Sequence, residues 1–264
     1  MGAPVSHTMA KLLYISPFCD IPPLAGGAQR SIHLLGQLAG QHQVHVLTPH
    51  KANASAFATW AVAQGITVDW FSQPAPQESG LRGRVFARFP PGFGDPAGLV
   101  AAIDRAWGAS GPFAVVYFAT QWAGLAATVK RRPARIILDL YDVYTPIAQA
   151  RARGVPPWRP YHWLFRLEAA RVQGHEVRLL RSADRVLTAS PEDANLVRRL
   201  HAGAAVTVIP NGVHLPPAAP RSPSPATVLM VASYSYGPNA EGFRWFFHEV
   251  WPHIRQGAPI LEDE

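Results

Sequence analysis

The sequence predicts an α/β protein built on a doubly wound parallel sheet. Short apolar runs rich in β-branched residues alternate with longer helix-compatible segments. The runs are apolar at nearly every position, which is typical of strands covered by helices on both faces rather than of a sandwich or a barrel. We therefore expect seven strands, at residues 11–16, 44–47, 66–71, 114–118, 135–140, 184–188 and 206–209.

Two of the connecting helices are clear. We expect a long helix from about Trp158 to Arg181, and a shorter one after Ser190, because serine caps a helix N-terminus and Pro191 suits the first turn. Both helices lead into strands. In such a sheet ligands bind at the carboxyl ends of the strands, so residues at those ends are the candidates for function.

Composition divides the chain into four parts. Residues 1–9 are expected to be a disordered leader, and residues 10–212 one parallel-sheet domain. Residues 213–226 hold five prolines, which interrupt helices and central strands, so this stretch is expected to be a linker. The pattern then restarts with a strand at 227–232 and an amphipathic helix from Asn239 to about Arg255. Since one strand and one helix cannot bury a sheet, residues 227–264 are expected to be the incomplete start of a second domain.

The net charge of +7 is concentrated in the middle of the chain. Residues 81–200 contain 18 Arg or Lys and 9 Asp or Glu, a difference of +9. A basic face of this kind attracts phosphates or an anionic membrane surface, and the alternative is a solvated basic helix face. Nucleic acid is not an expected partner, because no groove-reading motif accompanies the charge.

The sequence gives no reason to expect a metal or a resident cofactor. The single cysteine, Cys19, excludes an intramolecular disulfide and a multi-cysteine metal site, and the eleven histidines lack metal-ligand spacing. There is no apolar run of the roughly 20 residues that cross a bilayer, and no long apolar core of a signal peptide. We therefore expect a cytoplasmic location.

Two turns at strand ends are chemically suggestive. Gly26 and Gly27 lie between the first strand and a helix that carries Arg30 in its first turns, where glycines and the helix dipole favour a bound phosphate. A purely structural turn is the alternative. The strand that ends near Val208 runs into Pro210-Asn211-Gly212, a turn that tolerates positive φ directly before the linker.

These motifs resemble those of the family 4 glycosyltransferases, whose GT-B fold packs two Rossmann-like domains around a cleft. The segment VIPNGV at 208–213 resembles the family's hinge-side signature, and GGAQRS at 26–31 resembles its first glycine loop. LRSADRVLTASPEDANLVRRL at 180–200 resembles the last helix, strand and helix of the acceptor domain. VLMVASYSYGPNAEGFRWFFHEVWPHIR at 228–255 is similar to the start of the second domain in an exopolysaccharide-associated subgroup.

The resemblance implies a retaining glycosyltransferase that moves a sugar from a nucleotide-sugar donor to a glycan or lipid-linked acceptor in polysaccharide or glycolipid assembly. Such an enzyme would work in the cytoplasm, peripherally at the inner membrane face. Residues 10–212 would be the acceptor-side domain and 227–264 the start of the nucleotide-sugar-binding domain. Pro210, Asn211 and Gly212 would form the hinge. The implied contacts to the donor phosphates are Gly26, Gly27, Arg30, Ser233, Tyr234 and Asn239.

Carboxylates are the remaining candidates. Asp139 and Asp142 close the fifth strand, where polar side chains face the cleft and can orient an acceptor, although capping or turn formation explains them equally well. Family members often carry a histidine where Tyr141 stands, so no catalytic base is assigned. Glu168 and Glu176 match the spacing of the family's paired donor-site glutamates, but they lie in the acceptor-side domain, and we expect them to pair with arginines on a solvated helix.

Two hypotheses about function follow. In the first, the chain is a glycosyltransferase that is inactive alone, because most of the donor-binding domain is missing. In the second, it is a non-catalytic truncated or degenerate GT-B domain that binds an anionic acceptor, a membrane surface or a partner chain.

Overall fold

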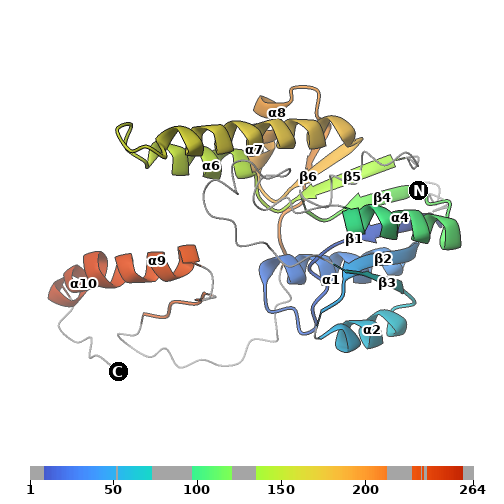
Figure 1. Cartoon of the computed structure of the whole chain (residues 1–264). Helices are drawn as coiled ribbons and strands as arrows, with labels where there is room; N and C mark the ends of the chain where they lie inside the picture. Colours follow the sequence, from blue (N-terminus) through green and yellow to red (C-terminus); the bar gives the residue numbers. More distant parts are fainter. Residues whose placement is uncertain are drawn as a thin grey trace, which may run out of the picture. The chain divides into compact units, whose positions relative to one another are not determined.

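The computed structural model describes residues 9–51, 53–72, 97–120, 135–212, 228–232, 234 and 237–257. The chain separates into two units, residues 1–212 and residues 213–264 (Figure 1). The expected leader, apart from Met9, and the expected linker lie outside the described residues.

The first unit contains a seven-stranded parallel sheet of order β3-β2-β1-β4-β5-β6-β7, which confirms the predicted fold class. The order reverses between β1 and β4, where Ile15 stands opposite Phe118 in the register. In doubly wound sheets this reversal opens a crevice at the carboxyl edge. The strands are β1 Lys11–Ile15, β2 Gln43–Pro49, β3 Thr67–Phe71, β4 Val115–Phe118, β5 Arg135–Leu140, β6 Arg185–Thr188 and β7 Val206–Val208.

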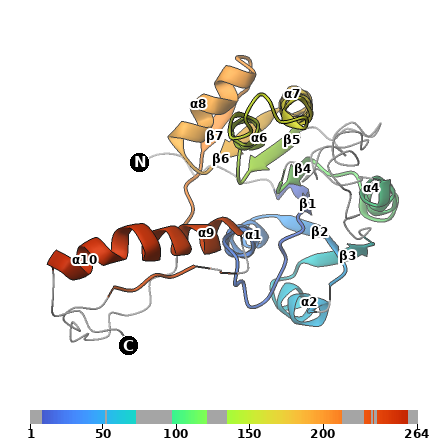
Figure 2. The same ribbon diagram turned by 60° about the vertical axis from the view of Figure 1, so that its left-hand side comes forward.

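Helices cover both faces of this sheet (Figures 1 and 2). Alternate strand residues supply two hydrophobic clusters, because successive side chains of a strand point to opposite faces. Leu13, Val116 and Leu138 pack on one face with α4, α7 and α8, whereas Tyr14 and Tyr117 pack on the other with α1 and α2. The helices of this unit are α1 Gly26–Ala39, α2 Ala54–Ala63, α4 Ala97–Ser110, α6 Tyr144–Arg153, α7 His162–Ser182 and α8 Pro191–Leu200.

The helices α6 and α7 form a hairpin held together by a buried carboxylate. Glu176 of α7 accepts hydrogen bonds from the backbone N–H groups of Tyr144 at 2.6 Å and Thr145 at 2.9 Å, and from the Thr145 hydroxyl. It therefore satisfies the free N–H groups that begin α6, a role that a local capping residue usually fills. Burial raises the pKa of Glu176, and the three hydrogen bonds oppose that effect.

The expectation of a solvated glutamate pair is therefore wrong. Glu168 and Glu176 are only 5% and 3% exposed. Glu168 lies 3.7 Å from the Arg151 guanidinium, so it does have an arginine partner, while Glu176 is used as a helix cap. Helical periodicity placed both residues on α7 but could not show that α6 packs across them.

The second unit differs from its prediction in one element. The helix is present as the continuous run α9 Gly237–Trp245, η2 Phe246–Val250 and α10 Trp251–Gly257. The strand expected at 227–232 is not formed over its described residues, 228–232, which are largely exposed. A strand needs a hydrogen-bonded neighbour, and the described part of this unit supplies none.

Of the helices in the described ranges, none combines the length and the apolar character that crossing a bilayer requires.

Candidate functional site

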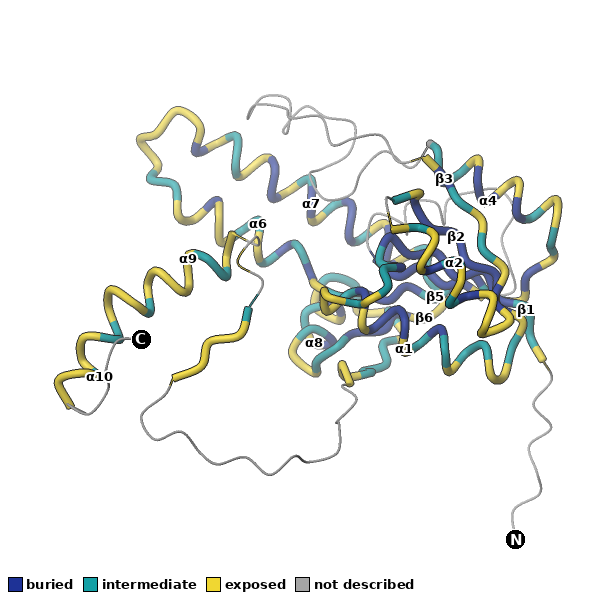
Figure 3. Tube along the Cα trace, turned by 90° about the horizontal axis from the view of Figure 1, so that it is seen from below, coloured by how far each residue is buried: buried dark blue, intermediate teal, exposed yellow. Residues whose placement is uncertain are grey.

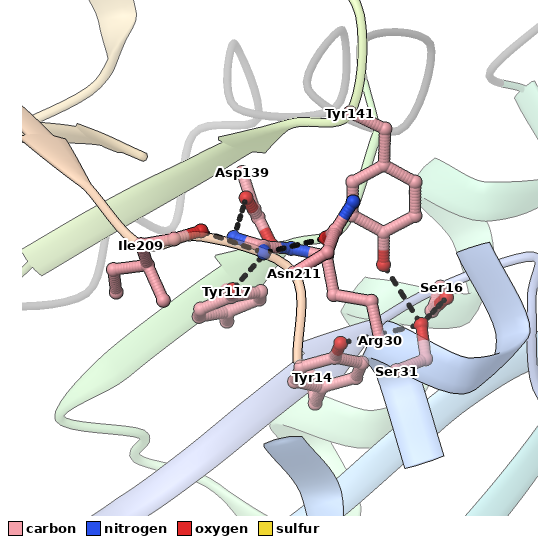
Figure 4. Close-up of polar contacts among 9 residues, drawn as sticks. All are labelled: Tyr14, Ser16, Arg30, Ser31, Tyr117, Asp139, Tyr141, Ile209 and Asn211. Carbon is pink, nitrogen blue, oxygen red and sulfur yellow. Dashed lines mark hydrogen bonds and ion pairs between the residues drawn. The ribbon is translucent and has the colours of Figure 1, made fainter. Parts of the chain in front are cut away.

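The candidate site lies where α1 meets the carboxyl ends of β1, β4 and β5. Its centre is Arg30, one helical turn into α1, whose side chain is buried against the sheet (Figure 4). The Nε atom of Arg30 donates to Asp139 Oδ2 at 2.8 Å and the Nη2 atom donates to Oδ1 at 2.9 Å. The side chains are 5% and 0% exposed, so this is a fully buried bidentate ion pair.

Tyr117 completes the environment of Asp139. Its hydroxyl, which reaches from the adjacent strand β4, donates to Asp139 Oδ2 at 2.7 Å. Burial and the neighbouring Asp139 charge raise the pKa of Tyr117 well above its usual range, so the phenol remains a neutral donor. Burial alone would lower the pKa of Arg30, but the hydrogen bonds and charge of Asp139 outweigh it and raise that pKa.

Arg30 also holds the end of the sheet domain. Its Nη1 atom donates to the backbone carbonyl of Ile209 at 2.8 Å and to Asn211 Oδ1 at 3.0 Å. One guanidinium thus joins α1, β5 and the segment that follows β7 (Figure 4). All three residues of the predicted hinge are exposed, and Asn211 is the one whose side chain accepts a hydrogen bond from Arg30.

A second set of hydroxyl groups lies beside this ion pair and centres on Ser31. The Ser31 Oγ atom is 3.0 Å from Ser16 Oγ and 2.8 Å from the Tyr141 hydroxyl, and it accepts a bond from Tyr14 at 3.4 Å. Burial is the main cause that raises the pKa of both tyrosines. These neutral hydroxyls bind α1 to the ends of β1 and β5.

The glycine loop has a packing role that its sequence did not reveal. Phe18 and Tyr141 stack with their ring centroids 5.6 Å apart. A Cβ atom on Gly27 would lie 2.9 Å from Phe18 Cδ2 and 3.1 Å from Tyr141 Cε2, closer than such contacts allow. A Cβ on Gly26 would meet nothing within 4 Å. The absence of a side chain at position 27 therefore lets the aromatic pair cover the start of α1.

Asp142 is placed differently from Asp139. It lies on the exposed surface just beyond the carboxyl end of β5. The carboxyl group is nevertheless partly shielded from solvent, and this partial burial and the nearby charge of Asp193 raise its pKa. Asp193 is itself bound to Ser190, which caps α8. Of the two predicted aspartates, Asp142 is thus the one at the surface.

Two predicted residues have partners inside the first unit. Arg30 and Asp139, expected to contact a donor phosphate and an acceptor, are both buried and form an ion pair with one another. Tyr234 and Asn239 belong to the second unit, and Ser233 lies outside the described residues. Within the described ranges, no group of three or more His, Cys, Asp or Glu side chains has a metal-binding arrangement.

Several residues of the site were missed. Tyr14, Ser16, Ser31 and Tyr117 were not singled out, although Tyr14 and Tyr117 occupy matching positions in paired strands and stack at 4.7 Å. A tyrosine within a short and largely apolar strand was the available signal. It indicates a buried hydroxyl that must find a partner.

We predict that Asp139→Asn destabilises the protein by about 3 kcal/mol or more, because it leaves the buried Arg30 charge without its counter-ion. The matched control is Asp20→Asn, which breaks the partly exposed pair with Lys51 at the same distance of 2.8 Å. That change should cost less than about 1 kcal/mol. Urea unfolding of both variants measures the difference, and equal losses would contradict the buried-pair interpretation.

We also predict that Gly27→Ala costs about 1 to 3 kcal/mol, since the added methyl group must displace Phe18 or Tyr141. Gly26→Ala is the control and should be neutral or slightly stabilising, because its Cβ enters open space at the start of a helix. Thermal unfolding of the two variants provides the comparison. A loss at position 26 as large as that at position 27 would disprove the proposed packing role.

Comparisons with solved structures return glycosyltransferases and related enzymes at low similarity. Spinosyn forosaminyltransferase is 13% identical over 97% of this chain and 65% of its own, with a TM-score of 0.46. The UDP complex of UDP-glucose:anthocyanidin 3-O-glucosyltransferase is 12% identical over 79% of this chain and 55% of its own, with a TM-score of 0.46. A sucrose-phosphate synthase from Thermosynechococcus elongatus is 13% identical over 76% and 89%, with a TM-score of 0.44.

At the level of sequence, no curated protein matches the chain significantly. The family described as "Glycosyl transferase 4-like domain" matches residues 25–212, which is more than half of the chain and includes Arg30, Asp139 and Asn211. The chain therefore belongs to the glycosyl transferase 4-like domain family.

Proposed function

We propose that this protein takes part in glycosyl transfer from a nucleotide sugar, and that residues 10–212 form the acceptor side of the reaction. The observation that carries the proposal is the family match over residues 25–212. The matched region contains β4, and β1 lies just before it; the order of the sheet reverses between these two strands. In sheets of this order, ligands bind at the carboxyl ends of the strands beside the reversal.

The start of α1 is the proposed contact for the donor diphosphate. No side chain caps this 14-residue helix at Ala25, and its first turn holds no acidic residue. Its N-terminal N–H groups at Gly26 and Gly27 and its dipole therefore favour an anion. In this proposal Arg30 does not contact the phosphate, since its guanidinium is bound to Asp139. It holds α1 in place against the sheet instead.

Asp142 is the proposed contact for the acceptor. It lies at the carboxyl edge, and a carboxylate there can accept a hydrogen bond from a sugar hydroxyl and so orient it. The resemblance to retaining enzymes of exopolysaccharide assembly supports a glycan or lipid-linked acceptor reached at a cytoplasmic membrane face.

In this proposal the second unit, taken by itself, belongs to the nucleotide-sugar-binding part of the enzyme. Ser233, Tyr234 and Asn239 are the proposed contacts there. In the structure the Tyr234 hydroxyl donates to the carbonyl of Met230 at 2.9 Å, while its side chain is partly exposed. The family resemblance, which assigns most donor contacts to a complete second domain, supports this division.

A non-catalytic binding role is the second candidate. It is favoured by the second unit, in which α9, η2 and α10 have no buried residue among those described. A glycosyl-transfer site built on these helices would need packing that the described residues do not provide. Binding of an anionic acceptor by the first unit requires no packing on these helices.

We predict no measurable sugar transfer by the 264-residue chain alone, and transfer when a complete GT-B nucleotide-binding domain is supplied with it. A panel of nucleotide sugars is tested with glycan and lipid-linked acceptors, and released nucleoside diphosphate is measured. Asp142→Asn should lower the transfer rate at least about tenfold through lost acceptor positioning. Asn195→Ala, on exposed α8 surface, is the control.

Each outcome of this assay has a meaning. Turnover by the chain alone would contradict the division between two domains. If no donor and acceptor react in any combination, while the chain still binds an anionic acceptor, the non-catalytic candidate replaces the transferase. An unchanged rate in Asp142→Asn would remove that residue from the site.

A further inference from the structure

The α6–α7 hairpin, residues 144–182, carries an unusual surface. It contains seven arginines and two acidic residues, Glu168 and Glu176, and both glutamates are buried. Every fully exposed charge on the hairpin is therefore positive. The exposed arginines are Arg151, Arg153, Arg159, Arg166, Arg178 and Arg181.

Large apolar side chains are exposed on the same hairpin. Trp158 is 80% exposed and Trp163 is 66% exposed, and Tyr161, Leu167 and Ile147 are exposed as well. Trp163 and Leu167 are four residues apart on α7, so they lie on one face of the helix. A group of exposed tryptophans and aliphatic side chains is rare on a protein surface and indicates an interaction site.

These residues are presented by an ordered end of the hairpin. The loop that joins α6 and α7 lies well away from the strands, and its trace is largely exposed (Figures 1 and 3). The buried ring of His162 bonds to the carbonyl of Val155 through Nδ1 at 2.7 Å, and the Arg159 N–H donates to the carbonyl of Pro156 at 3.0 Å. The Arg166 guanidinium lies 5.4 Å from the centre of the Trp163 ring.

Aromatic and arginine side chains together fit one kind of partner best. Tryptophan and tyrosine favour the interface between lipid headgroups and acyl chains, and arginine pairs with phosphate. Single-stranded nucleic acid also stacks on aromatic rings, but the aliphatic Leu167 and Ile147 offer it no stacking surface. Charge complementarity and apolar exposure are both satisfied by an anionic bilayer.

We propose that the loop end of the α6–α7 hairpin docks on an anionic membrane surface. Trp158 and Trp163 would enter the interfacial layer, and Arg153, Arg159 and Arg166 would contact lipid phosphates. The inference deepens the membrane-surface part of the proposed function. Because α6 begins two residues after Asp142, the hairpin would connect the docked loop to the carboxyl edge of the sheet.

The test is co-sedimentation of the full chain with two kinds of vesicle. One is made of phosphatidylcholine alone, and in the other about 30% of the lipid is phosphatidylglycerol. We expect binding only to the anionic vesicles, and less of it at high salt. Arg153→Gln/Arg159→Gln should weaken binding at least about tenfold, since each basic residue near an anionic surface contributes on the order of a fivefold change. Trp158→Ser/Trp163→Ser should weaken it similarly.

Matched controls separate this surface from general charge and hydrophobicity. Arg198→Gln/Arg199→Gln removes two exposed charges from α8, and Val62→Ser removes an exposed apolar side chain from α2. Both should bind like the unchanged protein. Circular dichroism confirms that each variant is folded, which is expected because every substituted side chain is exposed.

Three outcomes would overturn the proposal. These are equal binding to neutral and anionic vesicles, full binding by the Trp158→Ser/Trp163→Ser variant, and binding of single-stranded RNA without binding of vesicles. Sugar transfer to a water-soluble acceptor, assayed with the second domain supplied, should be unaffected by the hairpin substitutions. A failure of membrane docking is thereby distinguished from a failure of the transferase proposal.

Discussion

The buried pair of Arg30 and Asp139 is the interaction on which the candidate site depends. The two residues are 109 positions apart, and their pairing fixes α1 over the carboxyl ends of β4 and β5. The same guanidinium binds Ile209 and Asn211, so it also fixes the end of the first unit. Buried charges are tolerated only when polar partners surround them. Besides the ion pair itself, Tyr117 bonds to Asp139, and Asn211 and the backbone carbonyl of Ile209 bond to Arg30.

This constraint divides the polar residues of the carboxyl edge into two groups. Arg30 and Asp139 organise the edge from inside and have little surface to offer a ligand. Gly26, at the uncapped start of α1, and Asp142, beyond β5, remain at the surface. In the proposed function, chemistry at this edge would depend on the backbone N–H groups at the start of α1 and on the Asp142 carboxylate, with the buried ion pair holding α1 in place.

The fold was predictable from sequence to a greater degree than the site. Seven continuous apolar runs were sufficient to predict the parallel sheet, because buried strands of this kind have few alternatives. The strand expected at 227–232 is not formed over its described residues, 228–232. An apolar pattern does not indicate whether a neighbouring strand is present to pair with it. Arg30 and Asp139 were each singled out at helix and strand ends, but their pairing depends on how α1 crosses the sheet, which residue spacing does not show. Gly27 was predicted as part of a phosphate-binding loop. Its close approach to Phe18 depends on how the loop folds over the start of α1, which the sequence does not show.

In the proposed function a diphosphate binds at the start of α1 while Arg30 stays paired with Asp139. This arrangement can be tested by titrating ¹⁵N-labelled protein with a nucleoside diphosphate and following the backbone amide signals of Gly26 and Gly27 and the side-chain Nε–H signal of Arg30. The two glycine signals should shift and the Arg30 signal should not. Unmoved glycine signals, or an Arg30 signal that shifts as far as they do, would contradict this arrangement.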